Sequence, residues 1–392
     1  MTLMEKFKLA AAGYDAAVVQ SIEIEPLLIE CGAAAQVAPY LQRKDYRHVL
    51  IVSDSITYEI IGKQLEAAIA ASDMAVKATL IKPDKQGDVI ADEVSIVQLL
   101  LDIQHYAAEV VIAAGSGTLH DITRYAAFTA GIPFVSVPTA PSVDGFNSKG
   151  APIIIRGEKI TIAAIGPDAI FADLDVLMEA PVAMVAAGFG DMLGKYTSLF
   201  DWSYGSLAGG EAYSDIVATI TRDALMQCVE NVELIASRSE EGIRVLISAL
   251  IESGLAMLLF GQSHSASGAE HHLSHYWEME YIRLGNRQLL HGAKVGVACA
   301  EISRLYHRLA AEQAPAISGT EHAERISQLI AEIPNEETIR GWLSLVGGPS
   351  TTAELGVSDE LLARSLSQAH LVRPNRYTLL RAYNEGAESN IR

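Results

Sequence analysis

The first half of the chain alternates short apolar runs with stretches of helical periodicity. The apolar runs are rich in β-branched residues and are followed by turn-forming residues such as Ser53, Asp54 and Gly115. Strands that alternate with helices predict a parallel, doubly wound sheet whose strands are buried on both faces. The expected strands cover residues 47–52, 75–81, 109–114 and 133–137. Helices are expected up to residue 71 after the first strand, over 89–106 after the second and up to 130 after the third.

From about residue 180 the pattern changes to long helical segments, and strand-like runs nearly vanish. The expected helices cover residues 181–203, 211–237, 240–264, 268–284, 287–311, 322–333 and 357–387. The fold class is therefore α/β plus all-α. We expect a nucleotide-binding α/β domain over residues 1–178 and a helical domain over residues 179–392. A cleft between such domains is a common meeting place for a cofactor and a substrate.

Composition narrows the class of partner. Half of the 392 residues are hydrophobic, and the formal net charge is -19. Such a surface is repelled by nucleic-acid phosphates and by anionic membranes, so neither is an expected partner. The apolar stretch 246–260 is interrupted by Glu252 and Gly254 and is expected to be a buried helix. The N-terminus lacks the pattern of a signal peptide, and three scattered cysteines fit a reducing compartment, so we expect a cytoplasmic protein.

A glycine-rich turn follows the third expected strand. Glycines between a strand and a helix let the backbone approach a pyrophosphate, and the free N–H groups of the helix N-terminus favour an anion. The same pattern is found in turns that merely pack tightly, and the third glycine of the GxGxxG fingerprint is missing. The segment in question runs from Ala113 to Asp121 and includes Gly115, Ser116, Gly117, Thr118 and Leu119.

Asp54 directly follows the first expected strand. A carboxylate at this edge can accept hydrogen bonds from both ribose hydroxyls of an adenosine, and it would repel a 2′-phosphate, which favours NAD over NADP. Asp54 is also a good N-cap for the helix that follows, and sequence alone favours this role.

A polar loop, residues 136–150, follows the fourth expected strand. Its hydroxyl groups on Thr139, Ser142 and Ser148 are candidates for cofactor binding, and Asp144 is a candidate for contact with substrate hydroxyls. Loops at the carboxyl ends of parallel strands often carry such contacts. Proline, serine, aspartate and glycine are also ordinary turn formers, and the loop taken alone slightly favours a plain polar turn.

Histidines concentrate in the helical half. Five of the 11 lie between His264 and His291. His271 and His275 are four residues apart and share one helical face, while His291 lies at the start of the next expected helix. Together with Asp191, His271 and His291 provide one carboxylate and two imidazoles, which is the ligand set of an open, catalytic metal site. A plain surface cluster of histidines is the alternative.

Taken together, these segments resemble the superfamily of iron-type alcohol dehydrogenases, glycerol dehydrogenases and dehydroquinate synthases. Four motifs occur in the right order, and the resemblance covers most of residues 20–310. It implies a sheet domain that binds a nicotinamide cofactor and a helical domain that holds a divalent metal. Dehydroquinate synthases carry a glutamate where this chain has Asp191.

Within this superfamily the pattern is most similar to the bacterial type of sn-glycerol-1-phosphate dehydrogenases. The decisive segments are SVPTAPSVDGFNS (136–148), GDMLGKYTSLFDW (190–202) and SGAEHHLSHYWEM (267–279). The resemblance implies NAD-dependent reduction of dihydroxyacetone phosphate to sn-glycerol-1-phosphate, which feeds glycerophospholipid or ether-lipid synthesis. The alternatives are a glycerol dehydrogenase acting on unphosphorylated polyols and a cyclase similar to dehydroquinate synthase.

The resemblance also assigns roles to residues. It implies that Asp191, His271 and His291 bind the metal (zinc or nickel, with iron as a further option), that Asp144 and Asp191 contact the substrate, and that His275 relays a proton. It implies NAD contacts at Asp54, Gly115 to Leu119, Asp121, Thr139, Ser142 and Ser148. Lys149 stands where a small neutral residue is expected. The candidates for the substrate phosphate are Lys149, Lys195, Arg283 and Lys294, and a homodimer is expected.

Overall fold

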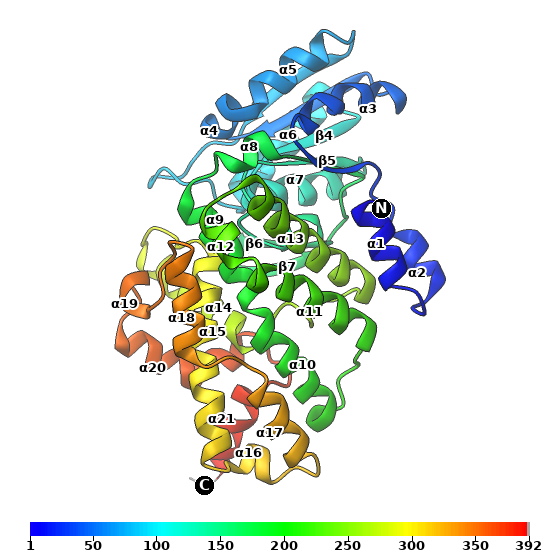
Figure 1. Cartoon of the computed structure of the whole chain (residues 1–392). Coiled ribbons are helices and arrows are strands. Elements are labelled where there is room, and N and C mark those ends of the chain that lie inside the picture. The colour runs from blue at the N-terminus through cyan, green and yellow to red at the C-terminus, as the bar shows by residue number, and fades with distance from the viewer. Residues whose placement is uncertain (390–392) are drawn as a thin grey trace.

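Six parallel strands form one sheet in the order β1-β8-β5-β4-β2-β3. This sheet lies in the upper part of Figure 1. The structure is a computed structural model that describes residues 1–389. The strands are β1 (Leu27–Glu30), β2 (His48–Ser53), β3 (Ala75–Leu80), β4 (Val110–Gly115), β5 (Phe134–Pro138) and β8 (Ala169–Asp173). The expected α/β fold with a parallel sheet is confirmed.

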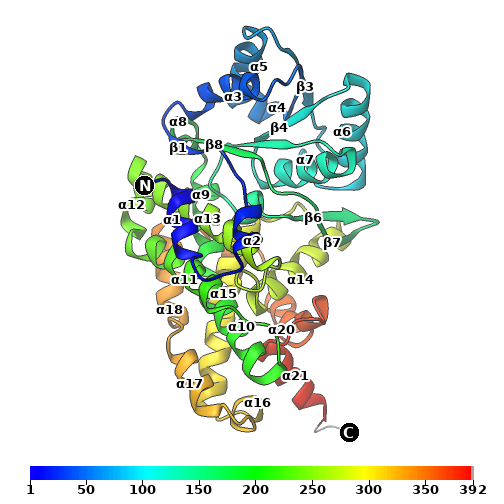
Figure 2. The same ribbon diagram turned by 90° about the vertical axis from the view of Figure 1, so that its right-hand side faces the viewer.

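Helices cover both faces of this sheet, as Figure 2 shows. Val49 and Ile51 of β2 are fully buried beneath one helical layer, and Leu50 and Val52 are fully buried beneath the other. Because successive side chains of a strand point to opposite faces, an uninterrupted apolar run is what such a two-sided position requires. The first layer holds η1 (Ala33–Gln36), α3 (Val37–Arg43), α4 (Ser55–Thr57), the π-helical η2 (Tyr58–Gly62) and α5 (Lys63–Ala70), and the second holds α6 (Glu93–Tyr106) and α7 (Gly117–Ala130).

Four strands match their predicted positions, but the sheet is larger than the sequence indicated. β1 and β8 were not predicted, and β8 lies inside the sheet, between β1 and β5. Both are very short, at four and five residues, so their apolar runs give little periodicity to recognise. A separate antiparallel hairpin, β6 (Gly150–Ile155) and β7 (Glu158–Ala163), was not predicted either.

The second half of the described chain is helical, with long helices that run down the lower part of Figure 1. The elements after β8 are α8 (Leu174–Met178), α9 (Val182–Leu193), α10 (Lys195–Gly209), α11 (Asp215–Glu230), α12 (Val232–Ala236), α13 (Glu240–Phe260), α14 (Ala269–Leu284), α15 (His291–Ala311), α16 (Pro315–Ser318), α17 (Ala323–Ala331), α18 (Glu336–Leu345), α19 (Thr352–Leu355), α20 (Asp359–Gln368), η4 (Ala369–Val372) and α21 (Leu379–Ser389). The short η3 (Gly145–Asn147) lies in the loop after β5.

Three expected helices are interrupted. The segment 181–203 breaks at Gly194, where the Lys195 side chain bonds the backbone carbonyl of Asp191 at 2.9 Å. The segment 211–237 divides at Asn231. The segment 357–387 leaves the helix over residues 373–378, because Pro374 has no N–H group and restricts the residue before it. This last break becomes important for the site.

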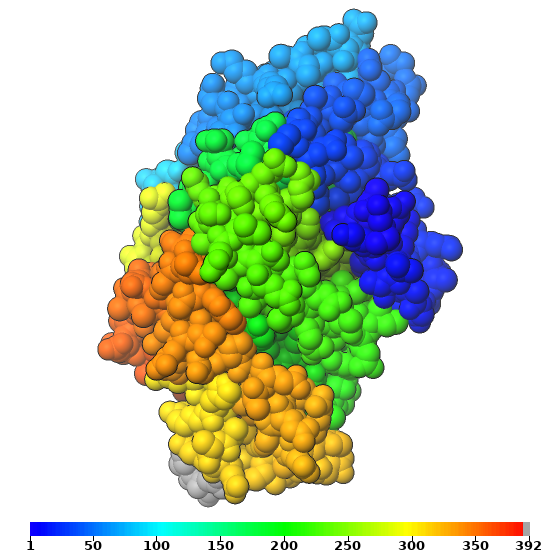
Figure 3. Space-filling model, viewed as in Figure 1, coloured from blue at the N-terminus to red at the C-terminus, as the bar shows by residue number. Residues whose placement is uncertain are grey.

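The N-terminal helices α1 (Leu3–Ala10) and α2 (Ala16–Ser21) lie beside the helical half, where Figure 3 shows them in dark blue against green. Phe7 of α1 is buried in the core that α11 and α13 share. The domain boundary at residue 178 stays a prediction. Among the described residues, α13 alone is long and apolar enough to cross a membrane, and 72 % of its most apolar window is buried inside the molecule.

Candidate functional site

Close packing of α9 against α15 positions the first group of candidate residues. A Cβ atom on Gly292 would lie 1.8 Å from the backbone oxygen of Ala187, and one on Gly190 would lie 2.5 Å from that of Gly292. Neither backbone oxygen can move without breaking its helix, so only glycine fits at these two crossing points. Asp191 of α9 is thereby held beside His291, the first residue of α15.

Three of the predicted side chains converge from three helices. His271 Nε2 lies 3.8 Å and His291 Nε2 lies 4.0 Å from the same carboxylate oxygen, Asp191 Oδ1. One ligand atom from each residue lies within 4.8 Å of the others. One carboxylate oxygen and two imidazole nitrogens suit a divalent transition metal and leave a coordination position open. The residues present therefore fit the expected metal.

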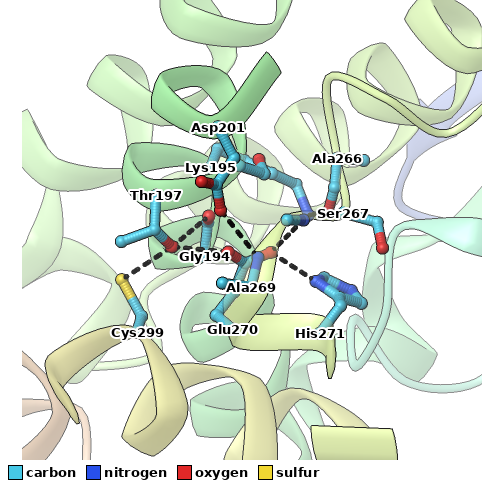
Figure 4. A network of polar contacts seen from close by, with 12 residues as sticks. Gly194, Lys195, Thr197, Asp201, Ala266, Ser267, Ala269, Glu270, His271 and Cys299 are labelled. Atoms are coloured by element: carbon cyan, nitrogen blue, oxygen red, sulfur yellow. Dashed lines mark hydrogen bonds and ion pairs between the residues drawn. The ribbon is translucent and has the colours of Figure 1, made fainter. Parts of the chain in front are cut away.

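The neighbour of His271 in the sequence fixes the direction of its ring (Figure 4). His271 Nδ1 lies 2.7 Å from Glu270 Oε1, which leaves Nε2 facing Asp191. Glu270 also accepts hydrogen bonds from the Gly268 N–H at 2.6 Å and from the Thr197 hydroxyl at 2.6 Å. A carboxylate behind a histidine is a common way to orient a metal ligand. Sequence reasoning missed Glu270, although an acidic residue beside a candidate ligand was the available signal.

Asp201 supports the same end of α14. It accepts hydrogen bonds from the Ala269 N–H at 2.8 Å, the Tyr306 hydroxyl at 2.7 Å and the Leu379 N–H at 3.0 Å. Burial, and then the nearby Glu270, raise the pKa of Asp201 to about 7. The residue therefore ties α10, α14, α15 and α21 together immediately behind the histidines.

The histidines of the site are neutral. Burial is the largest cause that lowers the pKa of His271, His275 and His291 well below the ordinary value. Neutral imidazole is the form that binds metals, so the buried environment prepares these rings for that role. His275 lies one helical turn from His271, and its ring centre is 6.1 Å from that of His271 and 6.0 Å from that of His291.

A buried lysine joins the two candidate aspartates. Lys195 Nζ lies 2.8 Å from Asp144 Oδ2 and 3.4 Å from Asp191 Oδ1. Asp144 also accepts a hydrogen bond from Ser253 at 2.8 Å, and its own N–H donates to Asp191 at 2.9 Å. Burial opposes ionisation of Asp144, but the charge of Lys195 outweighs it and lowers the pKa of Asp144. Burial, and then the charge of Asp144, raise the pKa of Asp191 to about 7.

A second ionic group borders the histidines. Glu278 of α14 lies 2.8 Å from Lys159 Nζ and 3.0 Å from Lys294 Nζ. Lys159 belongs to β7, so this group connects the unpredicted hairpin with the helical half. Glu278 also offers an oxygen near His275 and His291. Sequence reasoning did not find Lys159, because its partner is 119 residues away in the chain.

The predicted cofactor contacts gather at one edge of the sheet. β5, β4 and β2 are parallel neighbours, so Thr139, the turn after Gly115 and Asp54 all follow strands that end at the same edge. The Thr139 N–H bonds Gly115 O at 3.0 Å. Ser116 is the N-cap of α7 but makes no capping bond with its side chain, so it leaves the N-terminus of α7 open to an anion.

Other predicted residues of this edge have protein partners. Asp54 caps α4 through hydrogen bonds from Ile56 N and Thr57 N, at 2.9 and 2.7 Å, so the capping role that the sequence favoured is present. Ser148 donates to Gly145 O at 3.0 Å. Asp121 lies 2.8 Å from buried Arg124.

Arg124 was not predicted, and it links α7 to the polar loop. Its guanidinium donates to the carbonyls of Gly145 and Phe146, at 2.9 and 2.5 Å. The Arg124 guanidinium therefore holds the loop against α7 and also pairs with Asp121 of the same helix. Ser142 and Thr118 lie in these same two segments, the loop and the first turn of α7.

The four cations proposed for a substrate phosphate differ in their surroundings. Lys149 is exposed, and Arg283 is 65 % exposed and pairs with Glu280. Lys195 is enclosed by two carboxylates, and Lys294 pairs with Glu278. Carboxylates therefore neutralise three of the four cations, Lys195, Arg283 and Lys294.

Comparison with known proteins first identifies the general class of enzyme to which the chain is similar. The family model for iron-containing alcohol dehydrogenase matches residues 28–181. The crystal structure of glycerol dehydrogenase from Schizosaccharomyces pombe has a TM-score of 0.68 to this chain at 20 % sequence identity, and the match covers 93 % of this chain and 86 % of that chain. At this identity the likeness concerns the fold.

Sequence relatives narrow the class. The glycerol-1-phosphate dehydrogenase (NAD(P)+) of Geobacillus stearothermophilus is 46 % identical over 377 residues, which cover 93 % of both chains. The protein of that name from Bacillus velezensis is 45 % identical over 366 residues, covering 93 % of this chain and 92 % of the other. The chain therefore belongs to the glycerol-1-phosphate dehydrogenase (NAD(P)+) family. The resemblance stated from its motifs is confirmed.

Proposed function

We propose that this protein catalyses the reversible, NAD(P)H- and metal-dependent reduction of dihydroxyacetone phosphate to sn-glycerol-1-phosphate. The observation that carries the proposal is the convergence of Asp191, His271 and His291 on one point, in a chain 46 % identical to a relative of that name. The product would serve glycerophospholipid or ether-lipid synthesis.

Each half of the molecule has a distinct task in this proposal. Asp191, His271 and His291 hold a divalent metal, and the chemistry that the metal supplies is Lewis-acid polarisation of the ketone oxygen. Glu270 keeps the His271 ring in place through its hydrogen bond with Nδ1. Zinc or nickel is the proposed metal, with iron as a further option for this ligand set.

The edge of the sheet is the proposed place of the nicotinamide cofactor, which supplies hydride. The open N-terminus of α7 and the turn from Gly115 to Leu119 would receive the pyrophosphate. Asp54 would accept hydrogen bonds from the adenosine ribose, with NAD preferred to NADP. Thr139, Ser142, Ser148 and Asp121 are the remaining proposed contacts.

The proton that completes the alcohol requires a donor near the ketone oxygen. His275 is neutral because it is buried, and it lies beside both metal-binding histidines, so it suits a relay between solvent and substrate. Asp144 is held ionised by Lys195 and is placed to orient a substrate hydroxyl. The expected homodimer and the cytoplasmic location remain predictions.

The test compares two ketones. The protein is stripped of metal with a chelator, reloaded with zinc, nickel or iron, and supplied with NADH and either dihydroxyacetone phosphate or dihydroxyacetone. We expect metal-dependent oxidation of NADH with the phosphate ester and sn-glycerol-1-phosphate as the product. Turnover of dihydroxyacetone alone would indicate a glycerol dehydrogenase instead. Turnover of neither ketone would contradict the proposal and leave the cyclase alternative.

A further inference from the structure

The segment that interrupts the last predicted helix brings two arginines to the start of α14. After η4 the chain is non-helical from residue 373 to 378, and it packs along the loop 263–268 that leads into α14. Arg373 donates to the Ser267 hydroxyl at 2.9 Å and to the Ser263 hydroxyl at 3.5 Å. Arg376 donates to the backbone oxygen of Ser267 at 2.6 Å. Both guanidinium groups therefore meet at Ser267, four residues before His271.

Arg373 has no acidic partner among the described residues. Arg376 is paired, because its Nε lies 3.4 Å from Glu211. Arg373 binds only hydroxyl groups, and no carboxylate lies within 4.0 Å of its nitrogens in the described part of the chain. Burial, and then the charge of Arg376, lower the pKa of Arg373 to about 10, so the guanidinium is charged at neutral pH but poorly stabilised. The Arg373 side chain is partly exposed rather than fully buried, so an anion from solution can reach its guanidinium.

Buried polar atoms without partners surround the same place. Arg376 Nη2, Ser265 Oγ and both ring nitrogens of His272 are buried and make no hydrogen bond to the rest of the described protein. Such atoms are rare in folded proteins and usually bind a water molecule or an ion. Ser265 lies between Ser263 and Ser267, the two serines that Arg373 contacts, and Arg376 contacts the backbone oxygen of Ser267. The unpartnered donors and the unpaired cation therefore mark one polar environment.

This environment borders the metal-binding residues. Ser267 lies just before the first turn of α14, and that turn carries His271. Lys159 and Lys294 approach the same histidines, but both are occupied by Glu278. A phosphate group near that pair would meet a carboxylate as well as the two ammonium groups. At Arg373 the groups hydrogen-bonded to the guanidinium are the Ser263 and Ser267 hydroxyls, and neither carries a negative charge.

We propose that Arg373, assisted by the Ser267 hydroxyl, binds the phosphate monoester of the substrate. The proposal rests on the proposed function, because it deepens that function by naming the residue that separates a phosphorylated ketone from a plain one. In dihydroxyacetone phosphate the phosphate is attached to the carbon beside the carbonyl, so its site must border the metal site. A guanidinium can donate two parallel hydrogen bonds to phosphate oxygens, which a lysine cannot.

The experiment measures KM and kcat for dihydroxyacetone phosphate in Arg373→Met and Arg373→Lys. We expect Arg373→Met to raise KM about 10- to 100-fold, with a much smaller change in kcat, since a charge-assisted hydrogen bond to the substrate is lost. The preference for the phosphate ester over dihydroxyacetone should fall by a similar factor. Arg373→Lys should lie between the two, because it restores charge without the paired geometry.

Two variants serve as comparisons. Arg364→Met removes a guanidinium that pairs with Glu280, away from the metal residues, and should leave KM unchanged. Lys159→Met tests the rival pair of lysines. An unchanged KM in Arg373→Met, or a larger rise in Lys159→Met than in Arg373→Met, would overturn the inference while leaving the proposed function intact.

A binding readout makes the inference independent of turnover. Inorganic phosphate should raise the Tm of the wild-type protein, and this shift should shrink in Arg373→Lys and vanish in Arg373→Met. If the wild-type protein turned over no ketone, the proposed function would fail while this readout still decided whether Arg373 binds phosphate. An equal Tm shift in all three proteins would overturn the inference. If Arg373→Met is too unstable to be measured, an equal Tm shift in the wild type and in Arg373→Lys would overturn it.

Discussion

The two halves of the molecule contribute different kinds of chemical group to the site. The sheet half presents backbone, namely a glycine turn and the open N-terminus of α7. The helical half presents ionisable side chains that are almost completely buried, among them Asp191, Lys195 and Glu270. A backbone site is set by the fold itself, whereas a buried ionic site depends on every partner of every charge. Single substitutions should therefore act very differently in the two halves.

One residue of the sheet half crosses this division. Asp144 lies in the loop after β5, yet its carboxylate pairs with Lys195 of α10 and its N–H donates to Asp191 of α9. Both ends of the residue thus contact the helical half. These contacts therefore fix the loop after β5, where the cofactor is proposed to bind, relative to the proposed metal site on the helices.

The strongest test of the comparison removes one charge from the metal site. Asp191→Asn should abolish bound metal and lower kcat/KM at least about 10³-fold, because the metal loses its carboxylate ligand. The circular dichroism spectrum should remain that of the wild type, since Lys195 keeps Asp144 as a partner. Metal content of the purified protein and turnover of dihydroxyacetone phosphate are the measurements.

The matched control for this experiment is Asp215→Asn, an exposed acid in the first turn of α11. It changes the net charge by the same amount and should alter neither metal content nor turnover. Asp191→Asn with full metal and full activity would show that the three side chains are not the metal site.

The next test addresses the residue that orients a ligand. Glu270→Gln replaces one carboxylate oxygen by an N–H donor, although both oxygens accept hydrogen bonds in the native site. We expect metal affinity to fall about 10- to 100-fold, as is usual when the partner of a metal-binding histidine is altered. Competition with a chelator measures this affinity. Turnover at saturating metal should recover most of its wild-type value, and a persistent defect there would indicate that Glu270 acts directly in the reaction.

A buried histidine of the sheet half provides a contrasting test. His120 is fully buried between Ser116 O, 2.9 Å from Nδ1, and the Ser136 hydroxyl, 2.7 Å from Nε2, and burial lowers its pKa to about 4. The unfolded chain binds a proton near pH 6.5 that the folded chain does not bind until about pH 4. The contribution of His120 to stability is therefore complete above pH 6.5 and is lost as the pH falls towards 4.

The size of this effect is about 2 kcal/mol between pH 7.5 and pH 5. Urea unfolding at the two pH values measures it in the wild type and in His120→Gln. The variant should be less stable at both pH values, but its loss on acidification should be smaller than that of the wild type by about this amount. Equal losses in the two proteins would contradict the pKa assigned to His120.

Part of the fold and of the site could be predicted from the sequence because it depends on residues that are close together in the chain. Three of the four predicted strands, β2, β4 and β5, are buried on both faces and are therefore plain apolar runs, and the two histidines of the proposed metal site lie in a histidine-rich part of the sequence. β1 and β8 escaped because their sequences, LLIE and AIFAD, are short and each ends in an acidic residue, so neither gives a clear apolar run. Pro374 offered a signal for the break in the last helix, and that signal was not used.

The rest of the site depends on contacts that no local pattern records. Lys159 meets Glu278 across 119 residues, and Arg373 meets Ser267 across 106 residues. Which cation a carboxylate neutralises is decided only when distant segments pack together. For this reason the sequence offered Lys294 and Arg283 as phosphate ligands, while the structure pairs both of them with glutamates and leaves Arg373 unpaired.

The smallest expected effect concerns Asp54, where the sheet half does rely on a side chain. Asp54→Ala removes the cap of α4 and should lower the free energy of unfolding by about 1 kcal/mol. Asp92→Ala removes a similar cap from α6 and should have the same effect on stability. If Asp54 also binds the adenosine ribose, only Asp54→Ala should raise KM for NADH, about 10-fold, and shift the preference towards NADPH. Equal KM values for NADH in the two variants would restrict Asp54 to its capping role and leave cofactor binding in this half to the backbone alone.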